Sequence, residues 1–266
     1  MSLSRILPDC EPLKDRNSGF SHFVVPLAHE LLRYNTRYPL YCYVPPREVG
    51  GLGRLGVRYL TQRSFHKYFN PASYGLRLWH ATSQLSWYVP ARPVTKVVLT
   101  VHDFIFLHEN PDERTYTRQL ARVRRNTRRA DYLVTISDFV RHADLLGYTV
   151  RQPLRYVPRD VDAPWYYQHC LAYLPLLLAA GCGLPVVEAM QLGKPVLLSR
   201  LTSLPEVGGA AAYYFDDFSP QHLRQALAAG LARHTPARAA EAQARQFSWA
   251  QAAADYLTIY QELLGR

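Results

Sequence analysis

The chain has 266 residues, of which 48% are hydrophobic, so it is long enough to build one large or two modest globular domains. Its 31 Lys and Arg residues exceed its 21 Asp and Glu residues, which gives a formal net charge of +10. This excess favours anionic partners such as sugar nucleotides, lipid-linked phosphates and phospholipid surfaces. No motif of basic and aromatic residues accompanies the charge, so we expect no nucleic acid partner.

The cysteines and the apolar segments indicate the compartment. No charged segment followed by an apolar one opens the chain, and the uncharged residues 163–187 are interrupted by Pro and Gly, so we expect a cytoplasmic protein without a spanning helix. The four cysteines lack the spacing of metal ligands, which predicts reduced thiols and no metal site: Cys10, Cys42, Cys170 and Cys182.

The first 110 residues predict alternating helices and strands. Residues 1–18 form a polar lead-in with no assigned element, and apolar residues at helical spacing after Gly19 predict a helix over Ser21–Tyr34. The basic and aromatic segment Tyr59–Asn70 predicts a second helix with one exposed face. Short runs of apolar residues predict three strands, over Tyr38–Val44, Leu78–Thr82 and Val97–Val101.

A long helix over Pro111–Ala130 carries arginines on one face, because spacings of four, three and four keep them aligned. Two interpretations remain open: a solvated face, or a face that meets anionic lipid headgroups or a lipid-linked acceptor. A strand over Asp131–Ile136 follows, and Ser137 caps a helix that runs to about Leu146. The arginines of the face are Arg118, Arg122, Arg125 and Arg129.

The apolar run LAYLPLLL, which ends at Ala179-Ala180, predicts a strand, and the stretch Gly181–Glu206 after it predicts a glycine loop, a helix and another strand, which together form a βαβ unit. Pro185 suits the first position of the helix, Glu188 falls in its first turn, and Gly193 ends it. The loop would lie at the carboxyl edge of a parallel sheet, where the helix offers free N–H groups to a phosphate. Glu188 would there accept hydrogen bonds from a sugar diol.

The residues GLPVVEAMQLGKPVLLS, followed by SLPE, closely resemble the donor-binding core of family-four retaining glycosyltransferases with the GT-B fold. The resemblance implies that Glu188 holds the nucleotide ribose. The family's other glutamate, eight positions earlier against the donor sugar, is Ala180 here. The resemblance also implies that the residues facing the nucleotide or its phosphates are Gly181, Gly183, Leu184 and Pro185.

Further segments carry the same resemblance. Thr100-Val101-His102-Asp103 matches the family's Thr-x-His-Asp, which implies that His102 and Asp103 line the reacting cleft. A histidine held by local hydrogen bonds is the structural alternative. Ser137 belongs to a match with the family's Val-Ser-x-Phe element, and Gly19 takes the place of a glycine that faces the donor phosphates. Phe247-Ser248-Trp249 begins a last helix that, in the family, returns to brace the N-terminal half.

One internal departure separates this chain from the family. Only eight residues lie between Asp162 and Leu171, where the family has several βα units that supply the Arg and Lys binding the donor pyrophosphate. The expected fold class is therefore α/β and GT-B-like: a Rossmann-like acceptor-side domain (1–160), a shortened nucleotide-sugar-binding half (161–246) and a closing helix (247–266). The shortened half has too little core for itself, so we expect it to pack on the first half or to pair with a second chain as a homodimer.

The resemblance implies a glycosyltransferase that moves a sugar from a UDP- or GDP-sugar to a polysaccharide or lipid-linked acceptor with retention. It implies no metal and no other cofactor, because helix dipoles and basic side chains stabilise the departing diphosphate. Such an enzyme would act in the cytoplasm, with peripheral contact to the anionic inner face of the membrane. The alternative is a degenerate, non-catalytic family member that binds a nucleotide weakly or acts as a partner protein.

Overall fold

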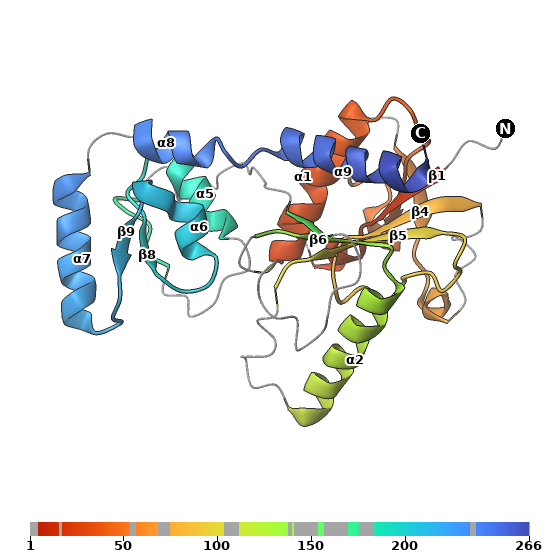
Figure 1. Ribbon diagram of the computed structural model, residues 1–266, viewed down its shortest axis with the longest axis horizontal. Coiled ribbons are helices and arrows are strands. Elements are labelled where there is room, and N and C mark those ends of the chain that lie inside the picture. Colours follow the sequence, from red (N-terminus) through yellow and green to blue (C-terminus); the bar gives the residue numbers. More distant parts are fainter. Residues whose placement is uncertain are drawn as a thin grey trace.

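The structure, a computed structural model, is an α/β fold with two parallel sheets (Figure 1), which confirms the expected class. A seven-stranded sheet lies with α1, α2 and α9 at one end of the molecule, and a two-stranded sheet lies with α5 to α8 at the other. The described residues are 5–15, 18–53, 57–68, 75–103, 112–137, 140, 154–156, 170–175, 183–234 and 238–265.

In the large sheet every neighbouring pair of strands is parallel, and the strand order is β3-β2-β1-β4-β5-β6-β7. Because all strands point the same way, their carboxyl ends meet at one edge, where α/β sheets place their functional groups. The strands are β1 (Arg5–Asp9), β2 (Tyr41–Val44), β3 (Arg58–Thr61), β4 (Leu76–Ala81), β5 (Lys96–Val101), β6 (Tyr132–Thr135) and β7 (Leu154–Tyr156).

The longer helices begin where a side chain caps free N–H groups. Ser18, Asp112, Ser219 and Ser248 accept hydrogen bonds from the main chain at the starts of α1, α2, α7 and α9. The helices are α1 (Gly19–Tyr34), α2 (Glu113–Arg129), α5 (Leu184–Gln191), α6 (Leu204–Gly208), α7 (Pro220–Arg233), α8 (Arg238–Ala244) and α9 (Trp249–Leu264). The small sheet pairs β8 (Leu197–Ser199) with β9 (Tyr213–Phe215).

Two sequence predictions are wrong in the N-terminal half. The lead-in contains a strand, since Arg5–Asp9 forms β1 between β2 and β4. This strand contains a Pro and an Asp, which are rare in strands, so its local sequence did not indicate a strand. The helix expected over Tyr59–Asn70 is replaced by edge strand β3 and a short 3₁₀ turn, η3 (Ser64–Lys67). This segment pairs with β2, and just after it the Gln62 N–H donates to Val44 O at 2.8 Å.

The strand predicted for the apolar run before Ala180 is described only in its first part. Within it, Tyr173 forms an isolated parallel bridge with Val196, and residues 176–182 lie outside the described residues. The helix expected from Ser137 to Leu146 lies largely outside them too. In the part of the chain that the structure describes, no helix is long and apolar enough to cross a bilayer.

The last helix packs on the large sheet. In Figure 1, α8 and α9 run one after the other along the top of the molecule, and α9 lies with α1 on the face of the sheet opposite α2. The Trp249 ring lies 5.6 Å from that of Phe23, and the Tyr256 hydroxyl lies 2.6 Å from Thr100 Oγ1. One buried apolar cluster joins α1 and α9 to β1, β2 and β4, while a second fills the space among α5, α6, α8 and β8.

Candidate functional site

His102 follows β5 directly and is buried at the carboxyl edge of the large sheet. Its Nε2 lies 2.7 Å from the carbonyl oxygen of Thr82, and because a carbonyl only accepts, this nitrogen carries the proton. Two phenyl rings from α1 make T-shaped contacts with the imidazole. Their centroids lie 4.8 Å (Phe20) and 4.7 Å (Phe23) from that of the His102 ring. The ring is therefore held in one orientation by β4 and by the first turns of α1.

Gln84 fixes the main chain on both sides of this position. Its Oε1 accepts from the His102 N–H at 3.2 Å, and its Nε2 donates to the Asp103 carbonyl at 2.9 Å. Asn126 of α2 in turn donates to the Gln84 carbonyl at 2.9 Å. The half-buried Asp103 thus sits on a backbone that two amide side chains hold in place.

Gly19 and Ser137 lie at the same edge but have different surroundings. Gly19 opens α1 in an exposed position, and a Cβ at Gly19 would meet no atom within 4 Å. Its neighbour Phe20 contacts His102, so the N-terminus of α1 adjoins the histidine. Ser137 is buried two residues after β6, the strand beside β5, and its Oγ accepts from the Val140 N–H at 3.2 Å.

The glycine loop leads into α5 through a left-handed residue, Gly183, with φ of +61°. The helix begins at Leu184, so Pro185 occupies its second position rather than the first. For the same reason Glu188 lies in the second turn, not in the first as the sequence predicts, and it is buried. Gly193, with φ of +65°, ends this segment as predicted. Gly181 lies outside the described residues.

The main core cluster includes the first residue of α5. Leu184, the first residue of α5, belongs to the same buried cluster as Phe23 and Trp249. Phe23 contacts the His102 ring, so one apolar cluster supports both the start of α5 and the end of β5. This cluster therefore connects the start of α5 to the N-terminal half.

A hollow of about 310 Å³ opens next to this site, at the end of β1, and sequence reasoning missed it because it missed the strand. Its deepest acidic residue, Asp9, is fully buried; Oδ1 accepts from the Glu11 N–H at 3.0 Å, and Oδ2 lies 2.5 Å from Ser86 Oγ. Burial, reinforced by the charge of Glu11, raises the pKa of Asp9 to about 8. At neutral pH this side chain is mostly an uncharged acid.

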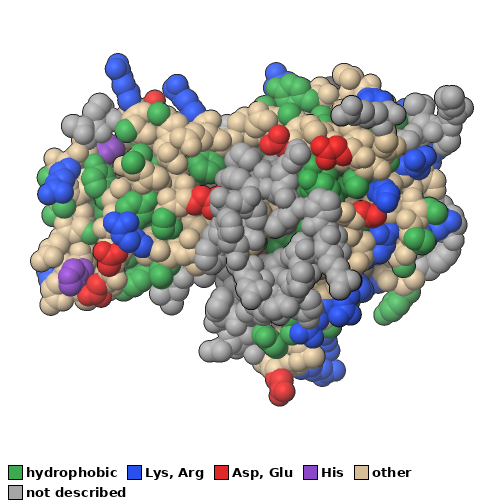
Figure 2. All heavy atoms as spheres, viewed as in Figure 1, with side chains coloured by type: hydrophobic (Ala, Val, Ile, Leu, Met, Phe, Trp, Pro, Cys, Tyr) green, Lys and Arg blue, Asp and Glu red, His purple; other side chains and the backbone are tan. Residues whose placement is uncertain are grey.

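The arginine face of α2 is divided between two roles. Arg122, Arg125 and Arg129 donate to main-chain carbonyls of the segment 85–95, with Arg129 also 3.2 Å from an oxygen of Asp131. These three side chains therefore hold a loop, which neither interpretation from the sequence anticipates. Arg114, Arg118, Arg124 and Arg128 are exposed, and Figure 2 shows Lys and Arg side chains gathered over α2.

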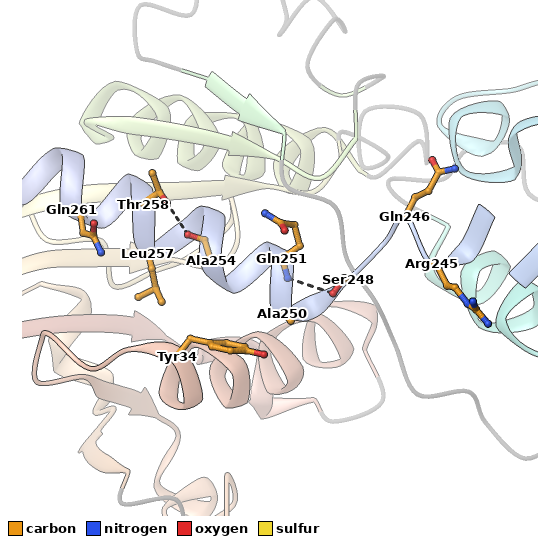
Figure 3. Close-up of a pocket in the computed structure, with 10 residues that line it drawn as sticks. All are labelled: Tyr34, Arg245, Gln246, Ser248, Ala250, Gln251, Ala254, Leu257, Thr258 and Gln261. Atoms are coloured by element: carbon orange, nitrogen blue, oxygen red, sulfur yellow. Dashed lines mark hydrogen bonds between the residues drawn. The ribbon is translucent and has the colours of Figure 1, made fainter. Parts of the chain in front are cut away.

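A second hollow, of about 660 Å³, lies along α9 and Tyr34 of α1 (Figure 3). Amide and hydroxyl side chains dominate its lining, and among the described residues around it the one charged group is Arg245. None of the described residues that line it carries a carboxylate or an imidazole. Within the described parts of the chain, no group of three His, Cys, Asp or Glu residues is arranged to hold a metal ion.

Comparison with known proteins relates this chain to glycosyltransferases. No protein-family model matches the sequence. Over 114 residues it is 37% identical to the O-antigen chain mannosyltransferase B of Escherichia coli, in an alignment covering 41% of this chain and 30% of that relative. Over 99 residues it is 36% identical to the serotype-specific mannosyltransferase WbdA of Escherichia coli, covering 35% of this chain and 12% of WbdA.

Solved structures show the fold. Anabaena Alr3699/HepE in complex with UDP and glucose matches with a TM-score of 0.75 at 12% identity, over 97% of this chain and 100% of that chain. Sucrose-phosphate synthase from Thermosynechococcus elongatus matches with a TM-score of 0.72 at 13% identity, over 98% and 99% of the two chains. AviGT4, a glycosyltransferase of avilamycin A biosynthesis, matches with a TM-score of 0.62 at 13% identity, over 98% of each. In sequence and in fold, the chain thus resembles family-four glycosyltransferases with the GT-B fold and a shortened donor-binding half.

Proposed function

We propose that this chain transfers a sugar from a UDP- or GDP-sugar to a polysaccharide or lipid-linked acceptor, with retention at the anomeric carbon. The partial matches to O-antigen mannosyltransferases and the UDP complex of a structural neighbour support this proposal. The observation that carries it is the arrangement of α5: a left-handed Gly183 at its start, a buried Glu188 in its second turn, and Leu184 in the cluster that also holds Phe23 beside His102.

In this proposal the Leu184 N–H at the start of α5 faces the donor phosphates, where the helix dipole favours negative charge. Pro185 has no N–H, and the N–H groups of Val186 and Val187 donate to the Gly183 carbonyl. Glu188 accepts hydrogen bonds from the ribose diol. His102 and Asp103 line the reacting cleft. Because Gly19 has no side chain, the donor can approach the start of α1. Ser137 borders the same edge from β6.

Charge stabilisation in this site depends on helix ends more than on cations. The departing diphosphate needs positive partners, and each lost donor commonly costs two to three orders of magnitude in rate. Lys194 follows the C-terminal end of α5, opposite the end that faces the phosphates. The short link between Asp162 and Leu171 omits the family's basic segment, which favours a second candidate function: nucleotide binding without transfer.

Calorimetric titration with UDP and GDP in the absence of metal tests the donor site. We expect one nucleotide to bind saturably and Glu188→Gln to weaken it at least tenfold. Glu241→Gln, which changes a carboxylate on α8 that is 33% exposed, serves as the matched control and should bind as the parent does. Absence of binding by both nucleotides would rule out the donor site.

A transfer assay then separates the two candidate functions. The protein that binds a nucleotide is supplied with the corresponding glucose and mannose nucleotides and with mannose oligosaccharides, and the anomeric configuration of the product is read by NMR. A product with the donor's configuration supports the retaining enzyme. Nucleotide binding without any product after prolonged incubation supports the non-catalytic alternative.

We also propose peripheral contact with an anionic membrane through α2. Arg114, Arg118, Arg124 and Arg128 of this helix are exposed, whereas Arg125 and Arg129 donate to carbonyls of the loop 85–95. Basic residues on one helix face attract anionic lipid at about 1 kcal/mol each near the surface.

A further inference from the structure

Thr82 connects the hollow at the end of β1 with the candidate site. Its hydroxyl donates to the main-chain oxygen of Asp9 at 2.5 Å, and its carbonyl accepts from His102 Nε2 at 2.7 Å. Phe20 also belongs to both places, because it lines the hollow and contacts the His102 ring. A group bound in the hollow would therefore lie next to the histidine.

The charged side chains around the hollow are paired with one another or with aromatic rings. Glu11, whose side chain is 13% exposed, accepts from Lys14 Nζ at 2.9 Å through Oε1 and from the Trp87 N–H at 2.9 Å through Oε2. Lys14 further donates to the Tyr88 hydroxyl at 3.3 Å. The guanidinium of Arg122 lies 3.2 Å from the centre of the Trp87 ring and donates to a loop carbonyl.

These pairings make the hollow a poor site for an anion. A phosphate would have to break the Lys14–Glu11 pair or the Arg122–Trp87 contact, and it would then lie beside the Glu11 carboxylate. Asp15, exposed at the rim, adds a second negative charge. An uncharged ligand with many hydroxyl groups meets no such cost, because its hydroxyls can donate to Glu11 and Asp15 and accept from serine hydroxyls.

The volume and lining suit one sugar ring. About 310 Å³ is at the small end of ligand pockets, which run from roughly 300 to 1,000 Å³. Ser83 and Ser86 supply hydroxyls on one side, while the apolar parts of the lining come from Phe20, Leu85 and Trp87. Apolar walls with a few fixed polar groups are the usual composition of a small-molecule site.

We propose that this hollow binds a single uncharged sugar residue at the end of the acceptor, and that Glu11 selects this residue against a phosphorylated one. The inference rests on the proposed function, because it takes the bound sugar to be the end of the acceptor, but it concerns residues that the donor site does not use. It places a neutral glycan end, rather than a lipid phosphate, beside His102.

Saturation-transfer NMR and calorimetry on the full chain test the inference without any nucleotide. The probes are methyl α-mannopyranoside, chosen because the sequence relatives are mannosyltransferases, and mannose 6-phosphate. We expect the neutral probe to bind at least tenfold more tightly than the phosphate. In Glu11→Gln the neutral probe should bind roughly tenfold more weakly, and the phosphate should bind more tightly because Lys14 is released.

Two further variants complete the test. Glu113→Gln removes an exposed carboxylate at the start of α2 that does not line the hollow, and it should change neither affinity. Asp15→Asn changes an exposed rim residue. It should shift the affinities for the two probes in the same direction as Glu11→Gln, and it remains a test if Glu11→Gln fails to fold. The inference is overturned if the phosphate binds as tightly as the neutral sugar, if neither probe binds, or if both lining variants leave the preference unchanged.

The outcome is separable from that of the donor-site titration. Sugar binding that survives in Glu188→Gln, together with absence of UDP and GDP binding by the parent chain, would retain the sugar site and remove the donor site. Nucleotide binding without sugar binding would do the reverse.

Discussion

The hydroxyl of Tyr260 on α9 lies 2.6 Å from Nδ1 of His80 at the centre of the large sheet. On its other side, the His80 Nε2 lies 2.8 Å from Thr100 Oγ1, which lies 2.6 Å from the Tyr256 hydroxyl. A buried polar chain thus connects the last helix to β4 and β5. Burial also lowers the pKa of His80 to about 3, so the imidazole is neutral at physiological pH.

Removing the first link of this chain should destabilise the fold. In Tyr260→Phe the buried Nδ1 of His80 loses its partner, and an unsatisfied buried polar group costs roughly 1–3 kcal/mol. Urea unfolding followed by fluorescence measures the loss. Tyr34→Phe, at a position 46% exposed on α1, is the matched control and should stay within about 0.5 kcal/mol of the parent. Equal stability of the two variants would contradict the role of the Tyr260–His80 bond.

The raised pKa of Asp9 predicts that stability falls as the pH rises. The folded state keeps a proton up to about pH 8, whereas the unfolded chain loses it near 3.8, so the contribution is complete below pH 3.8 and disappears through pH 8. The slope for one such group is about 1.4 kcal/mol per pH unit. His80 acts in the opposite direction between about pH 3 and 6.5, so unfolding should be measured from pH 6.5 to 8.

Asp9→Asn isolates the effect of that carboxyl group. The amide resembles the protonated acid in shape and cannot ionise, so the free energy of unfolding of this variant should lose the Asp9 share of the slope. We expect its stability relative to the parent to improve steadily from pH 6.5 to 8. Parallel pH profiles for parent and variant would show that Asp9 ionises normally in the folded protein.

Two glycines distinguish backbone strain from ligand approach. Gly183→Ala forces a Cβ into the left-handed region, which costs roughly 1–2 kcal/mol, and thermal unfolding should occur at a lower temperature. Gly19→Ala meets open space and should leave thermal stability unchanged. If the donor reaches the start of α1, the same variant weakens nucleotide binding, and unchanged nucleotide affinity would remove Gly19 from the site.

Neighbouring arginines of α2 should differ sharply in their effect on stability. Arg129→Ala removes hydrogen bonds to Pro90 O and Asp131 from a side chain that is 19% exposed, and hydrogen bonds of charged groups are worth about 1.5–3 kcal/mol. Arg128→Ala changes an exposed neighbour and should alter stability by no more than about 0.5 kcal/mol. Denaturant titrations of the two variants check this, and similar losses would mean that Arg129 does not hold the loop.

Vesicle binding tests the other arginines of that helix. The double variant Arg118→Glu with Arg128→Glu should bind phosphatidylglycerol-containing vesicles several-fold more weakly than the parent, with the difference shrinking as salt rises. The double variant Arg224→Glu with Arg233→Glu, at exposed positions of α7, makes the same change in net charge and is the control. Equal vesicle binding by all three proteins in sedimentation would reject α2 as the membrane-facing element.

Regular periodicity made much of the fold predictable. The final helix was identified from its Ser248 cap to Leu264, and β5, β6 and α2 follow from apolar runs and arginine spacing within a few residues. Segments whose state depends on partners far away in the chain were not predictable. Arg58–Thr61 becomes a strand because β2 offers a free edge, and Arg5–Asp9 becomes a strand despite Pro8 because β2 and β4 lie on either side of it.

The candidate site was predictable where a local motif carries it. The Thr-x-His-Asp match and the apolar strand before it predict His102 at a strand end, and the structure places it directly after β5. The glycine predicted before a helix is Gly183, which precedes α5. The group formed by Asp9, Glu11 and Ser86 was not visible, since Ser86 is 77 residues away from Asp9 along the chain. A lone Asp after two apolar residues does not indicate that its carboxyl group binds a distant hydroxyl or lines a hollow.

The position of α9 also affects how this protein is made. Six of its residues are buried in the cluster that also contains Ile6, Phe23 and Leu78: Trp249, Ala252, Ala253, Tyr256, Ile259 and Tyr260. A chain emerging from the ribosome therefore completes every strand of the large sheet long before the helix that covers one face of it. During that interval the apolar face is open to chaperones and to other nascent chains. Synthesis and stable burial of the first sheet are separated by the whole of the intervening second unit.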